Sequence, residues 1–324
     1  MKIRSPKEYL LLVSKGLAMG AADIVPGVSG GTIAFISGIY EELLASISSV
    51  NLDALKTLKA KGVKAFWNQI NGNFLVALVS GILISIVSLS KLIQYLLEDH
   101  PILIWSFFFG LIIASTVFVS KKINKWSFEN VFGLIIGTLI AYFVTIASPA
   151  QGPEGLIFIF LAGSIAICAM ILPGISGSFI LLLLGYYHQI LGTLSSLISN
   201  IKAGLIGDAI SNFIILAAFA LGCLFGLLSF SRVLNWLFKK AEMLTISILT
   251  GFMVGSLNKV WPWKKVIEYR FNSHGETVPF IETNILPQTY LENTGNDPQI
   301  IIALLLCLFG FFLVYFIEKI AAKK

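Results

Sequence analysis

Apolar residues follow one another along this chain in long blocks that are separated by short polar clusters. Blocks that carry few charges and approach the length of a membrane-spanning helix occupy residues 74–97, 102–120, 130–148, 212–236, 243–258 and 298–317. A helix of about 20 apolar residues crosses the hydrocarbon core of a bilayer. Two further apolar segments, near residues 9–48 and 156–198, are interrupted by glycine and proline. The pattern predicts an all-α, polytopic membrane protein.

The two interrupted segments are copies of one another. Residues 16–48 and 163–195 align at an offset of 147 with twelve identities. The match continues at an offset of 141 and resumes weakly at 173, so the second half contains an insertion, the polar stretch near residues 259–297. Such self-similarity indicates two homologous units. We therefore predict a first membrane repeat at residues 1–150 and a second at residues 151–324, with the insertion as an external loop.

Basic residues predict how the two repeats are oriented, because Lys and Arg concentrate in cytoplasmic loops. Basic residues flank the first interrupted segment on both sides, which predicts a re-entrant hairpin that enters from the cytoplasm. The second interrupted segment has weakly charged flanks and is predicted to enter from outside. Three spanning helices follow each hairpin, which gives two inverted-topology repeats, typical of transporters, with both termini in the cytoplasm. If residues 33–50 instead cross the bilayer completely, the number of membrane crossings changes.

The composition agrees with a membrane protein and argues against several other classes. Hydrophobic residues make up 56% of the 324 residues and charged residues 12%, with a mean hydropathy of +0.87, whereas soluble domains carry about 25% charged residues. The net charge of +6 lies in short loops, which fits topology determinants rather than nucleic-acid binding. The cysteines and histidines show no disulfide or metal spacing, so we expect neither metal nor cofactor. Lys15 interrupts the first apolar run, so no cleaved signal peptide is expected.

Each interruption places a Pro-Gly pair and small polar residues inside an apolar segment. Pro26 disfavours helix at the residue before it, and a new helix is expected to begin near Gly30 and to continue to about Ile47. The unpaired N–H groups and the positive dipole end of such a helix favour an anion such as phosphate. The candidate phosphate-binding residues are Gly27, Ser29, Gly30, Gly31, Thr32, Gly174, Ser176, Gly177 and Ser178. The alternative is structural: small residues kink the helix or allow close helix packing.

Charged residues inside apolar segments are few, so each is a candidate for coupling or for a mouth of the transport path. Asp23 precedes the proline of the first turn by three residues, and Met170 is its counterpart in the repeat alignment. It is either a proton-coupling site, or a cap or an ion-pair partner of Lys15. Four further candidates, paired by the alignment, are Glu41 with His188 and Lys91 with Arg232. Their alternatives are solvated helix ends and snorkelling side chains.

The run GAADIVPGVSGGTIAFISGIYEELL at residues 20–44 resembles the signature of a bacterial membrane-protein family, the polyprenyl-phosphate (undecaprenyl-phosphate) translocases. The PGISGS copy at residues 173–178 also fits, and the resemblance covers essentially the whole chain. It implies that undecaprenyl phosphate, a lipid carrier of cell-envelope glycan synthesis, is returned from the outer to the inner leaflet of the cytoplasmic membrane. The resemblance brings no assignment of binding residues, so the candidates above rest on physical reasoning.

The resemblance and the paired turns together favour a transporter of polyprenyl phosphate, with Asp23 neutralising part of the load if protons are co-transported. A soluble-anion carrier or channel is the alternative, and a lateral opening to the bilayer distinguishes the two. A membrane phosphatase needs a nucleophile with a base, or a metal cluster, and no histidine lies beside the serines of the turns. We therefore expect a protein that is not an enzyme and whose partners are the lipid and the bilayer; the oligomeric state stays open.

Overall fold

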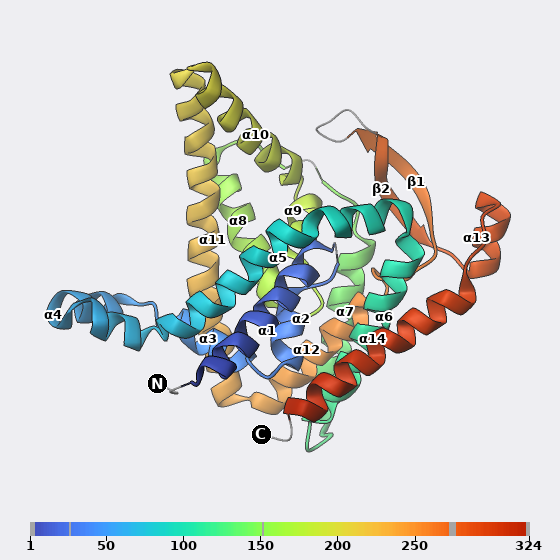
Figure 1. The fold of residues 1–324 in the computed structure, drawn as a ribbon, viewed down its shortest axis with the longest axis horizontal. Helices are drawn as coiled ribbons and strands as arrows, with labels where there is room; N and C mark the ends of the chain where they lie inside the picture. The colour runs from blue at the N-terminus through green and yellow to red at the C-terminus, as the bar shows by residue number, and fades with distance from the viewer. Residues whose placement is uncertain (1–3, 26, 151, 272–276, 322–324) are drawn as a thin grey trace.

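The computed structural model describes residues 4–25, 27–150, 152–271 and 277–321. Its first half contains α1 (Pro6–Ile24), α2 (Gly30–Ile36), α3 (Tyr40–Ser48), α4 (Leu52–Gln69), α5 (Gly72–Asp99), α6 (Pro101–Ser120) and α7 (Phe128–Ile146). Its second half contains α8 (Leu156–Ile171), α9 (Gly177–Leu183), α10 (Tyr187–Ala203), α11 (Ile206–Lys240), α12 (Glu242–Ser256), β1 (Lys264–Phe271), β2 (Thr277–Asn284), α13 (Pro287–Thr294) and α14 (Ile300–Ala321). Helices form the body, from which α4 and the α10–α11 pair project (Figure 1). The predicted helical membrane fold is confirmed, with one two-stranded sheet added to it.

Four helices among the described residues are long and apolar enough to cross a membrane, namely α5, α6, α7 and α11. They coincide with four of the six predicted spans. The other two, α12 and the apolar part of α14, are shorter. α12 has 15 residues, about 22 Å of helix against a hydrocarbon core of roughly 30 Å. Because most of α12 is buried against α6 and α7, its ends need not reach both membrane surfaces.

Helix pairs form the body, and glycines allow them to approach closely. α1 packs along α5 and α8 along α11, whereas α6 pairs with α14 and α7 with α12 across the two halves. A Cβ atom on Gly81 would lie 2.2 Å from the carbonyl oxygen of Val13 in α1. At the matching position of the repeat, a Cβ atom on Gly222 would lie 2.0 Å from the carbonyl oxygen of Phe160 in α8. Paired small residues therefore have the same packing role in both halves.

A Gly81→Val substitution is expected to prevent α1 from docking on α5. The new side chain would occupy the space of a backbone carbonyl group, which cannot move without shifting a helix, and overpacking of this kind costs about 1–3 kcal/mol or more. We expect the variant to lose the monodisperse peak in size-exclusion chromatography in detergent. Gly192→Ala is the matched control, because nothing lies within 4 Å of the added atom. A monodisperse Gly81→Val variant with wild-type melting would contradict the packing argument.

In each interrupted segment the turn is followed by two helices, α2 and α3 or α9 and α10, where one longer helix was expected. The helix predicted from Gly30 to about residue 47 begins at Gly30, but it ends at Ile36. The break falls at Gly38, whose φ of +72° lies in the left-handed region and interrupts the helix. Gly185 has a φ of +81° at the matching break between α9 and α10, and these two helices meet at 103°. The prediction of one continuous helix was therefore wrong, whereas the bent α9–α10 pair has the form expected of a re-entrant segment.

The polar stretch near residues 259–297, which was expected as a loop, is folded. β1 and β2 pair antiparallel and α13 follows them, and the strand sequences KKVIEYRF and TVPFIETN contain β-branched and aromatic residues that favour extended pairing. Trp261 donates its indole N–H to the carbonyl oxygen of Ile285, and Trp263 donates to that of Pro298. These bonds join the two flanks of the hairpin to one another, and the Trp261 ring packs edge-on against Phe109 of α6.

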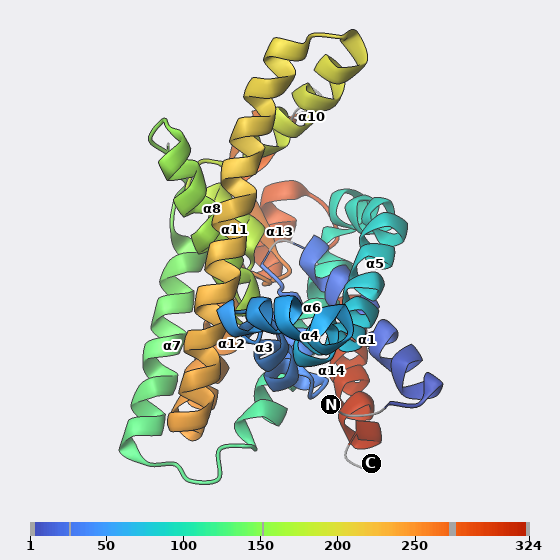
Figure 2. The same ribbon diagram turned by 90° about the vertical axis from the view of Figure 1, so that its left-hand side faces the viewer.

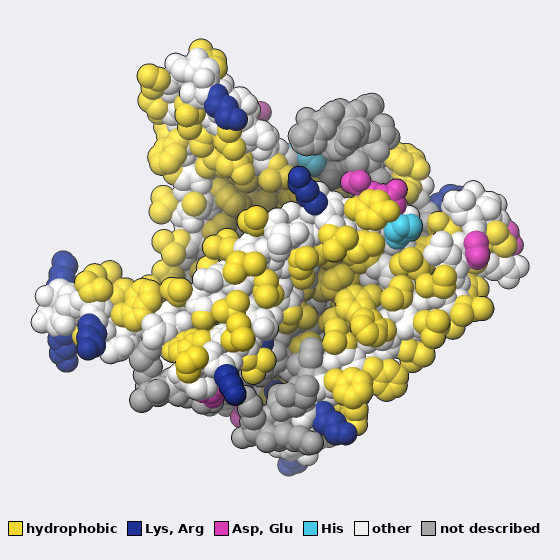
Figure 3. Space-filling view, viewed as in Figure 1, with side chains coloured by type: hydrophobic (Ala, Val, Ile, Leu, Met, Phe, Trp, Pro, Cys, Tyr) yellow, Lys and Arg dark blue, Asp and Glu magenta, His cyan; other side chains and the backbone are white. Residues whose placement is uncertain are grey.

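The termini and the β-hairpin lie toward opposite ends of the molecule (Figure 1). The two termini and the connection from α6 to α7 lie at one end, whereas the β-hairpin and the α10–α11 turn lie at the other (Figure 1, Figure 2). Apolar side chains cover most of the face in Figure 3, and basic side chains gather on α4 and beside the termini. α11 has 35 residues and is about 52 Å long, so it extends beyond the hydrocarbon core. This distribution agrees with cytoplasmic termini; the orientation and the inverted relation of the halves stay predictions.

Candidate functional site

The turn before α2 and the turn before α9 touch one another directly. Ser29 donates a hydrogen bond from its hydroxyl group to the carbonyl oxygen of Met170 at 2.9 Å. The backbone N–H of Gly174 donates to Oγ1 of Thr32, also at 2.9 Å. Ser29 and Thr32 are fully buried. Residues from both predicted copies thus form one interlocked unit, although Pro26 of the first copy lies outside the described residues.

The first N–H groups of α2 already have partners. Gly30 donates its N–H to Oδ1 of Asp23 at 2.7 Å, and Gly31 donates its N–H to Oγ of Ser29 at 3.0 Å. Asp23 lies in the last turn of α1, so its carboxylate caps the N-terminus of the next helix. The geometry supports the capping alternative for this residue. A phosphate that binds the N–H group of Gly30 has to displace the Asp23 carboxylate first.

The second turn differs chemically from the first because it has no carboxylate. Ser176 caps α9 by accepting the N–H of Phe179 at 3.5 Å, and its hydroxyl oxygen lies 2.9 Å from that of Ser178. Ser176 is buried and Ser178 is half-buried. The second turn therefore offers a hydroxyl pair for hydrogen bonding, whereas the first offers the N–H group of Gly30, which a carboxylate occupies.

The candidate glycines are required by the backbone as well as by any ligand. Gly27 and Gly174 hold the two turns in the same conformation, with φ values of +86° and +85° that residues with a Cβ atom rarely adopt. A Cβ atom on Gly31 would lie 2.4 Å from the carbonyl oxygen of Ile171. One on Gly177 would lie 2.6 Å from a backbone carbonyl oxygen of α8. Close packing is therefore a sufficient reason for these glycines, and tests of binding need other residues.

Replacing Thr32 with valine is expected to weaken the contact between the turns. Valine has the shape of threonine but leaves the buried N–H of Gly174 without its acceptor, which costs about 1–3 kcal/mol. We expect a lower midpoint of thermal unfolding in detergent micelles. Thr32→Ser keeps the hydroxyl group and is the matched control, with melting near wild type. Equal melting of the two variants would show that this hydroxyl group does not hold the turns together.

A polar cavity of about 460 Å³ lies between the β-hairpin and the ends of α7 and α9. Phe179 and Leu182 contribute the α9 side of its wall, and Lys259 lies between the cavity and the turns. A narrower recess that shares Lys259 with the cavity is lined by Gly27 and Gly174. The lysine stem packs on the first turn, since a Cβ atom on Gly27 would lie 2.5 Å from its Cγ. Lys259 therefore connects the cavity with both turns.

Lys264, the first residue of β1, brings a second ammonium group to the same cavity. Its side chain is 7% exposed, and its Nζ lies 3.5 Å from Oε2 of Glu282 and 3.9 Å from the centre of the Trp105 ring. Within the described part of the chain, Nζ has no hydrogen-bond partner. Burial lowers the pKa of Lys264 to about 8, and Glu282 opposes that shift. Burial also lowers the pKa of Lys259. Two poorly hydrated cations at one cavity suit an anionic ligand.

Lys259 and Lys264 were not among the residues selected from the sequence, because their segment was expected to be a polar external loop. A signal was present nonetheless. Lys259 and Lys264 are basic residues in a segment predicted to lie outside, where basic residues are less frequent. Cations placed against this bias are candidates for a binding role.

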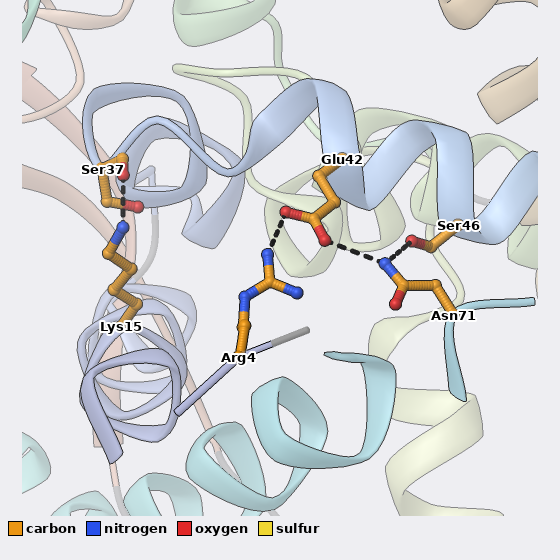
Figure 4. A network of polar contacts seen from close by, with 6 residues as sticks. All are labelled: Arg4, Lys15, Ser37, Glu42, Ser46 and Asn71. Carbon is orange, nitrogen blue, oxygen red and sulfur yellow. Dashed lines mark hydrogen bonds and ion pairs between the residues drawn. The ribbon is translucent and has the colours of Figure 1, made fainter. Parts of the chain in front are cut away.

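Glu42, rather than its neighbour Glu41, is held in a polar network at the start of α3 (Figure 4). Its carboxylate forms an ion pair with Arg4 and accepts a hydrogen bond from the amide of Asn71 at 2.8 Å. In the same view, Lys15 donates to a carbonyl oxygen at the end of α2 at 2.6 Å. These contacts connect the N-terminal segment and α1 to the α2–α3 pair. Glu41 is exposed.

The remaining charged candidates lie on exposed surfaces. Lys91 is exposed on α5, and His188 is exposed at the start of α10, where its ring packs edge-on against Tyr187. Arg232 donates to the carbonyl oxygen of Val50 at 2.9 Å and so connects α11 to the end of the first interrupted segment. The role of these residues at the mouths of a transport path stays a prediction.

Side chains suited to metal binding are scattered. No group of three or more His, Cys, Asp or Glu side chains that could hold a metal ion occurs within the described residues. The groups that do converge on the turns and the cavity are hydroxyl groups, backbone N–H groups, ammonium groups and two carboxylates. Such a set binds an anion through charge-assisted hydrogen bonds.

The apolar helices and the interlocked broken segments are those of a multi-pass membrane protein of the transporter class. The chain matches a family model described as undecaprenyl phosphate translocase-like over residues 19–278. It is 46% identical to a polyprenyl-phosphate transporter of Vibrio cholerae over 315 residues, which cover 97% of this chain and 98% of the relative. It is 36% identical to a polyprenyl-phosphate transporter of Staphylococcus aureus over 262 residues, 77% of this chain and 85% of the relative. The chain belongs to the undecaprenyl phosphate translocase-like family. No solved structure matches it.

Proposed function

We propose that this protein moves polyprenyl phosphate from the outer to the inner leaflet of the bacterial cytoplasmic membrane, so that the lipid is reused in cell-envelope glycan synthesis. The observation that carries the proposal is the contact between two broken-helix turns beside a cavity with two lysines. Relatives in Vibrio cholerae and Staphylococcus aureus are named polyprenyl-phosphate transporters. The proposed activity is transport without a covalent step.

A lipid substrate agrees better with the surroundings of the cavity than a soluble anion does. A lipid transporter needs polar groups that a headgroup can reach while its chain stays in hydrocarbon. The cavity is lined by residues at the C-terminal end of α7, whose outer side carries exposed apolar side chains such as Phe143 and Ile146. A carrier of soluble phosphate or sulfate remains the alternative, and it requires no such neighbouring apolar surface.

In the proposed cycle the phosphate passes from the cavity to the interlocked turns. Ser176 and Ser178 supply hydroxyl groups on one side, and the N–H group of Gly30 supplies a donor on the other once Asp23 has moved away. Alternating access at a site between two broken helices is the usual mechanism of carriers with this type of architecture. The same turns then release the phosphate toward the cytoplasmic side.

Inward transport of an anion is opposed by a membrane potential that is negative inside. The opposition amounts to about 2.3 kcal/mol per charge per 100 mV, and a phosphate monoester carries roughly −1.5 to −2 charges at neutral pH. A gradient of the lipid between leaflets or co-transported protons has to compensate for this. Proton uptake by Asp23 would both neutralise charge and weaken its bond to Gly30, which frees the donor for phosphate.

The test is transbilayer movement of fluorescent polyprenyl phosphate in sealed proteoliposomes. The labelled lipid is placed in the outer leaflet, and its protection from a membrane-impermeant quencher is followed with time. We expect protection to appear faster with the protein than in protein-free vesicles, and no acceleration for the matching polyprenol, which lacks the phosphate.

Two further measurements decide between the transport classes. Ser178→Ala removes a half-buried hydroxyl group from the second turn without filling space, and we expect it to slow movement of the lipid. Uptake of radiolabelled inorganic phosphate or sulfate is measured in the same vesicles. Uptake of the soluble anion without lipid movement would overturn the proposal and support the soluble-anion carrier.

A further inference from the structure

A second hollow, entirely apolar in character, adjoins the polar cavity. It has a volume of about 610 Å³ and lies along the outer side of α7. The residues that line it are Ile136, Leu139, Ile140, Phe143, Val144, Ala147 and Leu183. Ala147 also lines the polar cavity, and Leu183 follows Leu182, which lines the polar cavity as well. The two hollows therefore meet where the C-terminal ends of α7 and α9 lie together.

The two hollows have complementary chemistry. The polar one is lined by Lys259, Lys264 and Glu282, together with amide and hydroxyl side chains of Asn258 and Thr145. The apolar one offers no charged side chain, and its members Ile140 and Phe143 are 47% and 60% exposed. An amphiphile with a compact anionic head and a long hydrocarbon chain matches this arrangement, because each of its parts finds a surface of its own polarity.

Lys264 gives independent evidence that the polar hollow is built to receive an anion. Its ammonium group is more than nine-tenths buried, lines the cavity and has no hydrogen-bond partner within the described residues. Its ion pair with Glu282 is 3.5 Å long, beyond the usual length of a charge-assisted hydrogen bond. A phosphate oxygen would provide the acceptor that this buried ammonium group lacks.

We propose that the polar cavity is the entry site for the phosphate head of a polyprenyl phosphate, held by Lys259 and Lys264, and that the isoprenoid chain leaves it along the apolar groove on α7. This inference rests on the proposed function and adds the place and direction of lateral entry. Lys259 packs on Gly27, so a phosphate bound to it lies next to the turn into which it moves. Ala147 lines both hollows, so the junction between the phosphate head and the isoprenoid chain lies beside this residue.

The test uses photocrosslinking in vesicles of phosphatidylethanolamine and phosphatidylglycerol that contain radiolabelled polyprenyl phosphate. A benzophenone amino acid replaces Ile140 in the groove, and in a separate protein it replaces Leu304 on α14. Leu304 is the matched control, because it is apolar and 57% exposed but belongs to a different helix. We expect stronger labelling at position 140 than at position 304, and we expect unlabelled polyprenyl phosphate, but not polyprenol or inorganic phosphate, to compete with it.

Variants of the two lysines connect the groove to the cavity. In Lys259→Gln and Lys264→Met proteins, labelling at position 140 should fall toward the control level, since each lost charge-assisted contact weakens binding about tenfold. Lys265→Gln changes an exposed neighbour in the same strand and should leave labelling unchanged. Size-exclusion profiles and melting of the three variants identify any that fail to fold. Lys259 lies before β1, so Lys259→Gln tests the site without changing the hairpin.

Failure of the inference and failure of the proposed function give different results. Equal labelling at both positions, or labelling that the lysine variants leave unchanged, overturns the entry site even if the wild-type protein still moves the lipid between leaflets. Competition by inorganic phosphate as effective as that by the lipid assigns the cavity to a free anion and also overturns it. Absence of lipid movement by the wild-type protein in the same vesicles contradicts the proposed function itself.

Discussion

An Asp23→Asn variant is expected to move polyprenyl phosphate without responding to a pH gradient. In the wild-type protein, inward movement of the lipid should become faster when the outside is made acidic relative to the inside. In the variant this acceleration should disappear, while movement down a large lipid gradient continues. The measurement is the quencher-protection assay in proteoliposomes with and without an imposed pH difference.

The reason lies in competition between two anions for one donor. The Asp23 carboxylate accepts the N–H of Gly30 at 2.7 Å and fills the space beside its Cα atom. A phosphate that takes this donor must first displace the carboxylate, and a protonated carboxyl group is the weaker acceptor and the easier one to displace. Asparagine keeps an oxygen at this position but never carries the charge, so phosphate binding in the variant no longer requires a proton.

A second carboxylate provides the control for this prediction. Asp53 lies on α4, where it pairs with Lys56 and is mostly exposed, so Asp53→Asn removes one negative charge far from the turns. It should retain the wild-type response to the gradient. A wild-type response in Asp23→Asn would show that the carboxylate acts only as a cap. Loss of folding in Asp23→Asn, detected by melting, would be the result expected if the cap were essential to the hairpin.

The sequence was sufficient to locate the turns, because the signal there is local. A proline and a glycine inside an apolar block break a helix wherever the block lies, and Ser29 caps the new helix as small polar residues do. Contact between the two turns is a finding of the structure, through the bonds of Ser29 to Met170 and of Gly174 to Thr32. The break at Gly38 was missed because glycine inside a helix is often tolerated, and only its φ of +72° reveals the turn.

The cavity could not be predicted, because it depends on contacts between distant segments. Lys264 packs against Trp105 of α6, which is far from it in the sequence, and against Glu282, which lies on the other strand of the hairpin. The hydrogen bond from the Gly30 N–H to Asp23 could not be predicted either, because the sequence also allowed an ion pair between Asp23 and Lys15. Tertiary packing decided both cases. Charge placed against the positive-inside bias was the one sequence feature that pointed toward the lysines.

Affinity for the phosphate headgroup is expected to fall as the pH rises from 7 to 9. Burial lowers the pKa of Lys264 to about 8. The charge of Lys259 also lowers this pKa, whereas the carboxylate of Glu282 raises it. Below this pKa the ammonium form dominates, and above it the neutral amine does, so the charged fraction falls from about 90% at pH 7 to about 10% at pH 9. The phosphate itself titrates near pH 6 and changes little in this range. Binding of labelled polyprenyl phosphate to the protein in nanodiscs, measured against pH, should therefore weaken about tenfold.

Glu282→Gln moves this transition in a direction that a merely structural role would not produce. Removing the carboxylate 3.5 Å from Nζ takes away the interaction that favours the ammonium form, so the pKa of Lys264 falls and affinity is lost at lower pH than in the wild type. At pH values well below the transition, the same variant should bind the headgroup at least as tightly, because the phosphate no longer competes with Glu282. Glu268→Gln, on the exposed side of β1, should leave the transition in place. A transition that is unchanged by Glu282→Gln would show that neither Lys264 nor Lys259, whose pKa the same carboxylate raises, is the group whose charge the phosphate needs.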